Sequence, residues 1–304
     1  MNDINIKEIT TELRNENTMN IDTLSTIEIL KKINQEDKIV PLAIEKILPD
    51  ISVLVDKIVC AFKQKGRLIY MGAGTSGRIG VLDASECPPT FGVSRNMVIG
   101  LIAGGKKALV TAVERAEDSK ELAIIDLKKI KISAKDVVIG IAASGRTPYV
   151  LGGVEYARSI GAITGCITTS KNSILASSVD YPIVAVTGAE VVTGSTRMKS
   201  GTAQKLICNM LTTTSMIKLG KVYKNLMVDL KPTNEKLISR SISIICELTS
   251  YSKEKATQLF YEYKDVKAVI LSDLFDIHDK KKLDALLKKY NRNLNTIIKE
   301  YKGE

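Results

Sequence analysis

Hydrophobic residues in the middle of the chain gather in short runs that turn-forming residues separate. Five such runs, rich in Val and Ile, lie at 67–71, 96–104, 136–143, 162–168 and 181–187. Short apolar runs of this kind are typical of strands that are buried on both faces of a sheet. The segments between them have helical spacing, and the segment 107–129 is among the longest. Alternating buried strands and helices predict an α/β fold with a doubly wound parallel sheet.

The flanking parts of the chain show helical spacing only. The segment 25–34 predicts one helix, and 41–66 predicts two helices that Pro49 separates. A long apolar helix is expected at 201–222, and the chain beyond it is helical and rich in lysine. We therefore divide the chain into an N-terminal helical segment at 1–56, a sheet domain at 57–222, and a linker with a small helical domain at 223–304.

A glycine-rich loop follows the first apolar run, where Gly72, Gly74 and Gly77 form G-x-G-x-x-G. A dinucleotide-binding fold has an acidic residue about 20 residues further on, which binds the ribose hydroxyls at the end of the second strand. Here the second apolar run ends in Ala103-Gly104-Gly105, without a carboxylate. The glycine pattern therefore does not indicate a dinucleotide site.

Two predicted strand-to-helix loops share the tripeptide Ser-Gly-Arg, at 76–78 and at 144–146. Hydroxyl groups and backbone N–H groups at a helix N-terminus bind phosphate monoesters, and glycine lets the backbone approach the anion. Ordinary turns capped by Ser or Thr would explain either loop alone, but two such loops on one sheet favour a phosphate site beyond the strand ends. The candidate binding residues are Thr75, Ser76, Gly77, Ser144, Gly145, Arg146 and Thr147.

A third polar stretch, 188–205, precedes the long apolar helix. Its candidates for completing the pocket are Glu190, Ser195 and Thr196. Ser200 or Thr202 can equally well cap the following helix, in which case the stretch has no part in binding. The residues alone leave both interpretations open.

Acid–base chemistry is expected from carboxylates, because His278 is the only histidine and lies in the Lys-rich tail. A His-based triad or a His-ligated metal site is therefore not expected. Glu86 comes shortly before Pro88-Pro89, which we expect to end a helix, so its carboxylate can face a pocket. Glu117 lies on the expected helix 107–129, where the composition by itself favours a solvated surface.

Composition limits the classes of partner. The 304-residue chain carries a net charge of +10, but no basic stretch interleaves aromatic residues for base stacking, so we do not expect a nucleic-acid partner. No run approaches the ~20 apolar residues of a membrane span, and the polar N-terminus does not resemble a signal peptide. The five cysteines form no Cys-x-x-Cys pair, which indicates a reducing cytoplasm and no zinc site.

Long blocks of the chain match one family closely. The blocks are MGAGTSGRIGVLDASECPPTFG at 71–92, GIAASGRTPYV at 140–150, EVVTGSTRMKSGTAQK at 190–205, INQEDKIVPLAIEKILPDI at 33–51 and NLMVDLKPTNEKL at 225–237. They resemble the N-acetylmuramic acid 6-phosphate etherases. This resemblance implies a sugar isomerase (SIS) domain, a small C-terminal helical domain and a homodimer.

The resemblance also implies an activity. The family cleaves the D-lactyl ether of N-acetylmuramic acid 6-phosphate during cell-wall recycling, without a metal or organic cofactor. The products are N-acetylglucosamine 6-phosphate and D-lactate. Its two catalytic glutamates match Glu86 and Glu117, which overrides the solvated-surface interpretation of Glu117. The family has Gly where Arg115 stands in this chain.

Other classes of protein share this type of domain. The alternative that we retain is a sugar-phosphate sensor resembling glucokinase regulatory protein, although that family carries two such domains on a much longer chain. A SIS-domain transcription regulator would need an N-terminal helix-turn-helix, and 1–60 shows no basic recognition helix. Phosphosugar isomerases would have the same pocket with different acid–base residues.

Overall fold

The computed structural model describes residues 10–111, 113–232 and 234–302. The chain forms two compact units. The first comprises the chain up to Ser85 together with Arg95–Thr212, and the second comprises Glu86–Ser94 and the chain from Thr213 onward. Two long helices, α4 (Gly74–Phe91) and α8 (Lys199–Lys218), contribute residues to both units. The domain boundaries that we predicted after residues 56 and 222 do not coincide with the limits of these two units, and they remain an interpretation of the sequence.

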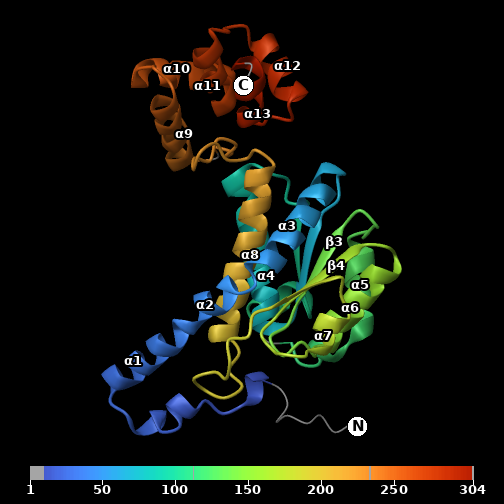
Figure 1. Ribbon diagram of the computed structural model, residues 1–304. Coiled ribbons are helices and arrows are strands. Elements are labelled where there is room, and N and C mark those ends of the chain that lie inside the picture. The colour runs from blue at the N-terminus through green and yellow to red at the C-terminus, as the bar shows by residue number, and fades with distance from the viewer. Residues whose placement is uncertain (1–9, 112, 233, 303–304) are drawn as a thin grey trace. The chain divides into compact units, whose positions relative to one another are not determined.

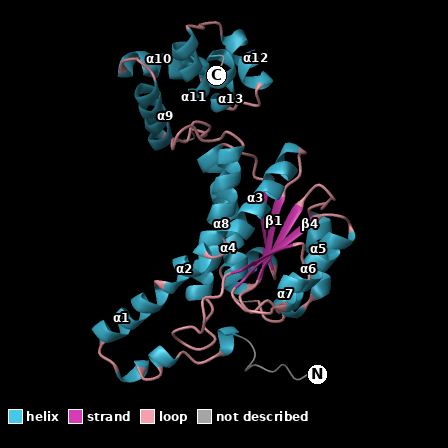
Figure 2. Ribbon diagram, in the orientation of Figure 1, coloured by secondary structure: helices cyan, strands magenta, loops and turns pink. Residues whose placement is uncertain are grey.

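The first unit is built on a parallel five-stranded sheet with the order β2-β1-β3-β4-β5 (Figure 2). Its strands are β1 (Leu68–Gly72), β2 (Val98–Ile102), β3 (Val137–Ile141), β4 (Ile163–Thr168) and β5 (Tyr181–Val184). β1 pairs with β2 on one side and with β3 on the other, so Leu68 lies opposite both Val98 and Val137. Four of these strands lie within the apolar runs, and β1 extends one residue beyond its run, to Gly72, so the predicted α/β sheet is confirmed.

Helices cover both faces of this sheet (Figure 1). Tyr70 points toward α4 and α8, where its hydroxyl donates to the carbonyl of Cys208 at 3.4 Å. The next residue, Met71, lies on the opposite face against Gly153 of α6. Side chains of β1 thus alternate between two helical layers. The helices are α3 (Leu48–Lys63), α4 and α8 on one face, and α5 (Lys120–Lys129), α6 (Pro148–Ser159) and α7 (Ile174–Ser177) on the other.

The N-terminal region of the first unit is helical, as predicted. Within the described residues, three short 3-10 helices precede α1 (Thr26–Asp37) and α2 (Ile39–Glu45), and lie at Thr10–Glu12, Glu16–Thr18 and Ile21–Thr23. Ser25 caps α1, and its backbone N–H donates to the Glu28 carboxylate at 2.9 Å. The two helices expected within 41–66 are α2 and α3, with Pro49 in the first turn of α3.

The prediction of one helix at 107–129 is wrong for most of that segment. A 3-10 helix at Gly105–Leu109 and another at Ala116–Asp118 precede α5, which begins at Lys120. The backbone breaks at Arg115, which has a left-handed φ of 63°. Ser119 then caps α5 by accepting a hydrogen bond from the Leu122 N–H at 3.1 Å. Capping chemistry and local backbone conformation therefore override the helical spacing here.

Pro88-Pro89 do not end a helix as expected. Both lie inside α4, which continues to Phe91. A proline φ near −65° is compatible with a helix, although each ring removes one backbone hydrogen bond and crowds the carbonyl four residues earlier. The helix ends where Gly92 takes a left-handed φ of 67° and donates its N–H to the carbonyl of Pro88 at 3.0 Å.

The second unit is largely helical, which confirms the predicted helical C-terminal region. Its helices are α9 (Glu235–Leu248), α10 (Lys253–Tyr263), α11 (Val266–Phe275), α12 (Lys280–Lys289) and α13 (Leu294–Lys302). α11 is the central helix, since every residue from Val266 to Ser272 is buried. Leu283 and Ile297, from the last two helices, belong to the same core. His278 is exposed and pairs only with Asp276 among the described residues.

Candidate functional site

A pocket of about 380 Å³ opens at the carboxyl ends of β1 and β3. These two strands are neighbours at the point where the strand order reverses, which is where open parallel sheets bind ligands. The pocket is lined by Glu12, Ala73, Gly74, Thr75, Ser76, Glu117, Asp118, Ala142, Ala143, Ser144, Arg146, Thr147, Pro148 and Thr196. Both Ser-Gly-Arg loops therefore contribute to one pocket.

The loop between β1 and α4 places two hydroxyl groups in this pocket. Gly72 and Gly77 let the strand end and the first turn of α4 approach each other, since a Cβ on Gly72 would lie 2.6 Å from the Gly77 nitrogen. Gly77 is therefore a packing residue and does not line the pocket. Thr75 and Ser76 do, and the Ser76 hydroxyl donates to the buried side chain of Gln204 on α8 at 2.9 Å.

The loop between β3 and α6 is fixed from below by β4. The carbonyl of Ala143 accepts hydrogen bonds from the hydroxyls of Thr168 and Thr169 at 3.0 and 3.2 Å. Gly145 has a φ of 65°, and a Cβ there would lie 2.2 Å from the Cβ of Ser173. Gly145 therefore shapes the loop from behind, while its neighbours Ser144 and Arg146 line the pocket.

The third polar stretch contributes unevenly to the pocket. Thr196 lines it, whereas Ser195 lies outside the lining residues. Glu190 is fully buried, and its two carboxylate oxygens accept the backbone N–H groups of Lys199 and Ser200, each at 2.9 Å. Glu190 thus caps α8, for which Ser200 and Thr202 were the capping candidates in the sequence.

The pocket also holds three carboxylates. Glu117 and Asp118 come from the 3-10 helix before α5, and Glu12 comes from the N-terminal segment. Glu12 and Gln204 were not predicted from the sequence. Glu12 lies in a polar stretch without periodicity, and Gln204 lies on an apolar helix, so no local pattern indicated either residue.

A buried network holds the Glu12 segment in place. The amide of Asn15 donates to the Glu36 carboxylate at 2.7 Å and to the carbonyl of Ala189 at 3.0 Å. The Lys199 ammonium donates to the same carboxylate at 2.6 Å. Burial favours the neutral form of Glu36, but these donors and Asn17 outweigh it, and the pKa of Glu36 is lowered.

Two family descriptions match the chain. "Glucokinase regulatory protein N-terminal SIS domain" matches residues 50–158, and "SIS domain" matches residues 112–214. An N-acetylmuramic acid 6-phosphate etherase from Vibrio campbellii is 58% identical over 273 residues, which are 88% of this chain and 89% of that protein. An etherase of the same name from Halalkalibacterium halodurans is 60% identical over 244 residues, which are 80% of this chain and 82% of that protein.

The chain belongs to the N-acetylmuramic acid 6-phosphate etherase family. Its fold is shared more widely. A Bacteroides fragilis protein named as a phosphosugar isomerase involved in capsule formation superposes with a TM-score of 0.51 at 22% identity, over 66% of this chain and 95% of that one. That likeness concerns the fold alone.

Among the described helices, none is long and apolar enough to cross a membrane.

In this etherase-family chain, Glu86 lies outside the lining residues of the pocket. It is exposed on α4, eleven residues after Thr75. Eleven residues of α-helix span about 16 Å along the helix axis. Glu117, in contrast, lines the pocket. The two candidate glutamates are therefore placed differently within one chain.

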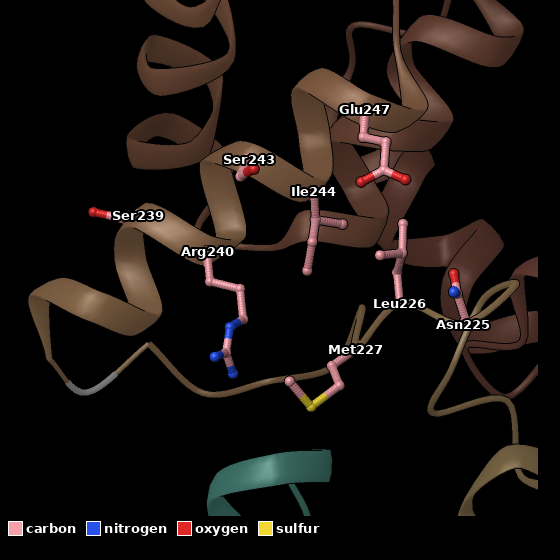
Figure 3. A pocket seen from close by; sticks show the side chains of 8 residues that line it. All are labelled: Asn225, Leu226, Met227, Ser239, Arg240, Ser243, Ile244 and Glu247. Carbon is pink, nitrogen blue, oxygen red and sulfur yellow. The ribbon is translucent and has the colours of Figure 1, made fainter.

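A second hollow, of about 530 Å³, lies entirely within the second unit of this etherase-family chain (Figure 3). Leu226, Met227 and Ile244 form its apolar part, and Arg240 and Glu247 contribute one charge of each sign. It contains neither Ser-Gly-Arg loop nor a candidate glutamate. It is therefore distinct from the pocket at the carboxyl ends of β1 and β3.

Proposed function

We propose that this protein cleaves the D-lactyl ether of N-acetylmuramic acid 6-phosphate, giving N-acetylglucosamine 6-phosphate and D-lactate in cell-wall recycling. The observation that carries this proposal is the 58% identity to an etherase over 273 residues, nearly nine-tenths of both chains. The pocket is consistent with it, since hydroxyl groups and carboxylates meet there at the ends of β1 and β3.

The phosphate group would bind to the two Ser-Gly-Arg loops. Thr75 and Ser76 lie in the first turn of α4, and Ser144 and Thr147 precede α6, so hydroxyls stand beside two helix N-termini. Within the described residues, the Thr147 side chain makes no capping hydrogen bond to α6, so its hydroxyl is available to an anion. The helix start adds little, since Pro148 has no N–H and the Val150 N–H already donates to the Thr147 carbonyl at 3.0 Å. The guanidinium of Arg146, which also lines the pocket, would add a positive charge beside the phosphate.

The chemistry proposed for the carboxylates is elimination followed by addition of water. In the open-chain sugar, the C1 aldehyde acidifies the C2 proton, and a base removes it. The C3–oxygen bond then breaks, and lactate leaves as its ether oxygen is protonated. Water adds to the unsaturated aldehyde at C3, and C2 regains a proton. Each positioned acid or base typically contributes about 10²–10⁴ in rate.

We assign Glu86 to protonation of the departing oxygen and later activation of water, and Glu117 to assistance in proton transfer. Because Glu86 is not among the residues that line the pocket, we propose a homodimer in which each copy supplies Glu86 to the pocket of the other. Apolar side chains on the N-terminal helices, including Ile27, Leu30 and Leu42, are exposed and provide a surface for such an assembly.

Mixing two inactive variants tests this arrangement. Glu86→Gln and Glu117→Gln should each lower turnover by at least about 10² without unfolding the chain. If the two glutamates of a site come from different copies, unfolding and refolding the variants together restores one intact site in each mixed dimer, roughly a quarter of wild-type activity. No recovery, with mixed dimers verified by mass spectrometry, would place both glutamates of a site on one chain.

Isotope labelling tests the reaction itself. In ¹⁸O-labelled, deuterated water, elimination leaves the lactate hydroxyl unlabelled, puts label at C3 of the sugar and introduces deuterium at C2. Hydrolysis at the lactyl carbon would instead label the lactate and leave C2 protonated. Label in the lactate would overturn the elimination mechanism.

The second candidate function is a sugar-phosphate sensor, which the match of residues 50–158 to the glucokinase regulatory protein domain favours. That match covers the shared domain, whereas the etherases match nearly the whole chain. Binding of N-acetylmuramic acid 6-phosphate without release of lactate would support the sensor.

We further propose a cytoplasmic location without a nucleic-acid or membrane partner, in keeping with five cysteines that are all free thiols.

A further inference from the structure

A second polar cavity, of about 370 Å³, lies within the second unit beside the start of α11. Its charged lining consists of four cations and two carboxylates, namely Lys221, Lys231, Lys264, Arg292, Asp229 and Asp265. The positive surplus distinguishes this cavity from the hollow in Figure 3, where the single cation Arg240 is matched by Glu247.

Internal partners already saturate both carboxylates of this cavity. One oxygen of Asp229 accepts from Lys221 at 2.9 Å and from Lys267 at 2.8 Å, and the other lies 3.3 Å from the Arg292 guanidinium. Asp265 pairs with Arg292 at 2.8 Å and also caps α11 through the Lys267 N–H. Neither carboxylate has capacity left to neutralise further cations.

Two lysines of the lining are left without an acidic partner. Among the described residues, Lys231 and Lys264 form no ion pair. Lys264 ends α10 in a left-handed conformation, with a φ of 54°, that normally favours glycine. Lys231 directly precedes Pro232, which restricts its backbone to extended conformations. The backbone of each lysine is thus constrained.

We propose that this cavity binds an oxyanion of the phosphate class, either inorganic phosphate or the phosphate group of a sugar phosphate. Lys231 and Lys264 would each donate charge-assisted hydrogen bonds to it, and Lys221 and Arg292 would add long-range attraction from the cavity wall. The site would be separate from the pocket at the ends of β1 and β3, because every charged residue in it belongs to the second unit.

The buried charge behind the cavity supports an anion. Lys267 is fully buried, and its ammonium donates to the carbonyls of Gly220 and Arg292 as well as to Asp229. Burial lowers the pKa of Lys267, against the opposing attraction of Asp229. A bound dianion would compensate for the surplus of positive charge that this cluster holds.

The test separates the two phosphate sites in the full-length chain. Ser76→Ala with Ser144→Ala removes hydroxyls of the first pocket, and calorimetric titration with inorganic phosphate at constant ionic strength then reports the second. We expect one phosphate per chain to remain bound. Adding Lys231→Met and Lys264→Gly should weaken that binding by about tenfold for each lysine.

Two controls keep the result interpretable. Arg240→Ala removes one positive charge from the same unit and should leave phosphate affinity unchanged. Lys264→Gly places glycine at a left-handed position, so the melting temperature of this variant should not fall although its phosphate affinity does. The proposal is overturned if the Ser76→Ala, Ser144→Ala chain binds no phosphate, or if the two lysine changes leave its affinity unaltered.

A second titration distinguishes the source of the anion. Equal affinity for inorganic phosphate and N-acetylglucosamine 6-phosphate in the Ser76→Ala, Ser144→Ala chain would support recognition of the phosphate group alone. Tighter binding of the sugar phosphate would support a phosphosugar site. Either outcome supports the site only if Lys231→Met and Lys264→Gly weaken this binding while Arg240→Ala leaves it unchanged.

Discussion

The same tripeptide, Ser-Gly-Arg, serves the pocket in two different ways. At 76–78 it lies inside the first turns of α4, where Gly77 packs on the end of β1 and Arg78 donates to the carbonyl of Leu109 at 3.0 Å. At 144–146 it lies in an irregular loop, where Gly145 is left-handed and Arg146 lines the pocket. Only the serines of the two tripeptides share a location.

The difference follows from where each helix begins. α4 begins at Gly74, two residues before Ser76, so helical geometry turns Gly77 and Arg78 away from the ligand side. α6 begins at Pro148, after the tripeptide, so the backbone of the second loop is held instead by Thr168 at the end of β4 and by the following residue, Thr169. Identical short motifs therefore report a shared location and not a shared conformation.

The largest expected effect concerns the glycine of the second loop. Gly145→Ala forces a left-handed residue to carry a Cβ that would lie 2.2 Å from Ser173, so we expect a loss of about 2–5 kcal/mol in the free energy of unfolding. Gly74 also has a positive φ, of 50°, but a Cβ added there by Gly74→Ala would have no atom within 4 Å. It should cost about 1–2 kcal/mol. Urea denaturation measures both, and equal losses would contradict the steric account.

The next effect separates the two serines. The Ser76 hydroxyl already donates to Gln204, whereas among the described residues the Ser144 hydroxyl has no hydrogen-bond partner. Ser144 is thus free to donate to a phosphate oxygen, and a hydrogen bond to a charged group is worth about 1.5–3 kcal/mol. Ser144→Ala should therefore weaken binding of the sugar phosphate by about 10–100-fold, and Ser76→Ala by less. Calorimetry in which Ser76→Ala is the more damaging change would reverse this assignment.

Much of the fold was predictable because strands and helices carry periodic signals. The five apolar runs located the strands, and the paired loops located the pocket from Thr75 and Ser144. The break at Arg115 was not predictable from spacing, because Ser119 and a left-handed residue override a helical pattern locally. Glu12 was missed since it reaches the pocket through a buried network around Glu36, which connects residues far apart in sequence.

A smaller effect separates the two arginines. Arg146 lines the pocket, so Arg146→Ala should raise the KM for the phosphosugar by about tenfold, since it removes a charge-assisted interaction with the substrate. Arg78→Ala instead removes a hydrogen bond to Leu109 and should cost about 1 kcal/mol of stability with an unchanged KM. Steady-state kinetics and urea denaturation of both variants check this. A raised KM in Arg78→Ala alone would show that the first arginine faces the ligand.

The smallest effect concerns Arg115, a non-glycine residue with a left-handed backbone beside the pocket residue Glu117. Its φ of 63° nearly equals the 65° of Gly145, yet Arg115 is exposed and carries a full side chain. Arg115→Gly should relieve about 1–2 kcal/mol of backbone strain and lose about 0.4–1 kcal/mol through the freer unfolded chain. The net change in unfolding free energy is then a gain of about 0–1.6 kcal/mol.

The matched control is Lys131→Gly, because Lys131 is also exposed and has a φ of 53° but lies outside the pocket lining. Both changes should stabilise the chain similarly in urea. Arg115 lies two residues before Glu117, so only Arg115→Gly can also alter kcat by shifting the 3-10 helix that carries this carboxylate. Equal stabilisation with unchanged kcat in both variants would show that the arginine strains the backbone without displacing Glu117. A loss of stability confined to Arg115→Gly would instead mean that the arginine side chain makes a stabilising contact that outweighs its strained backbone.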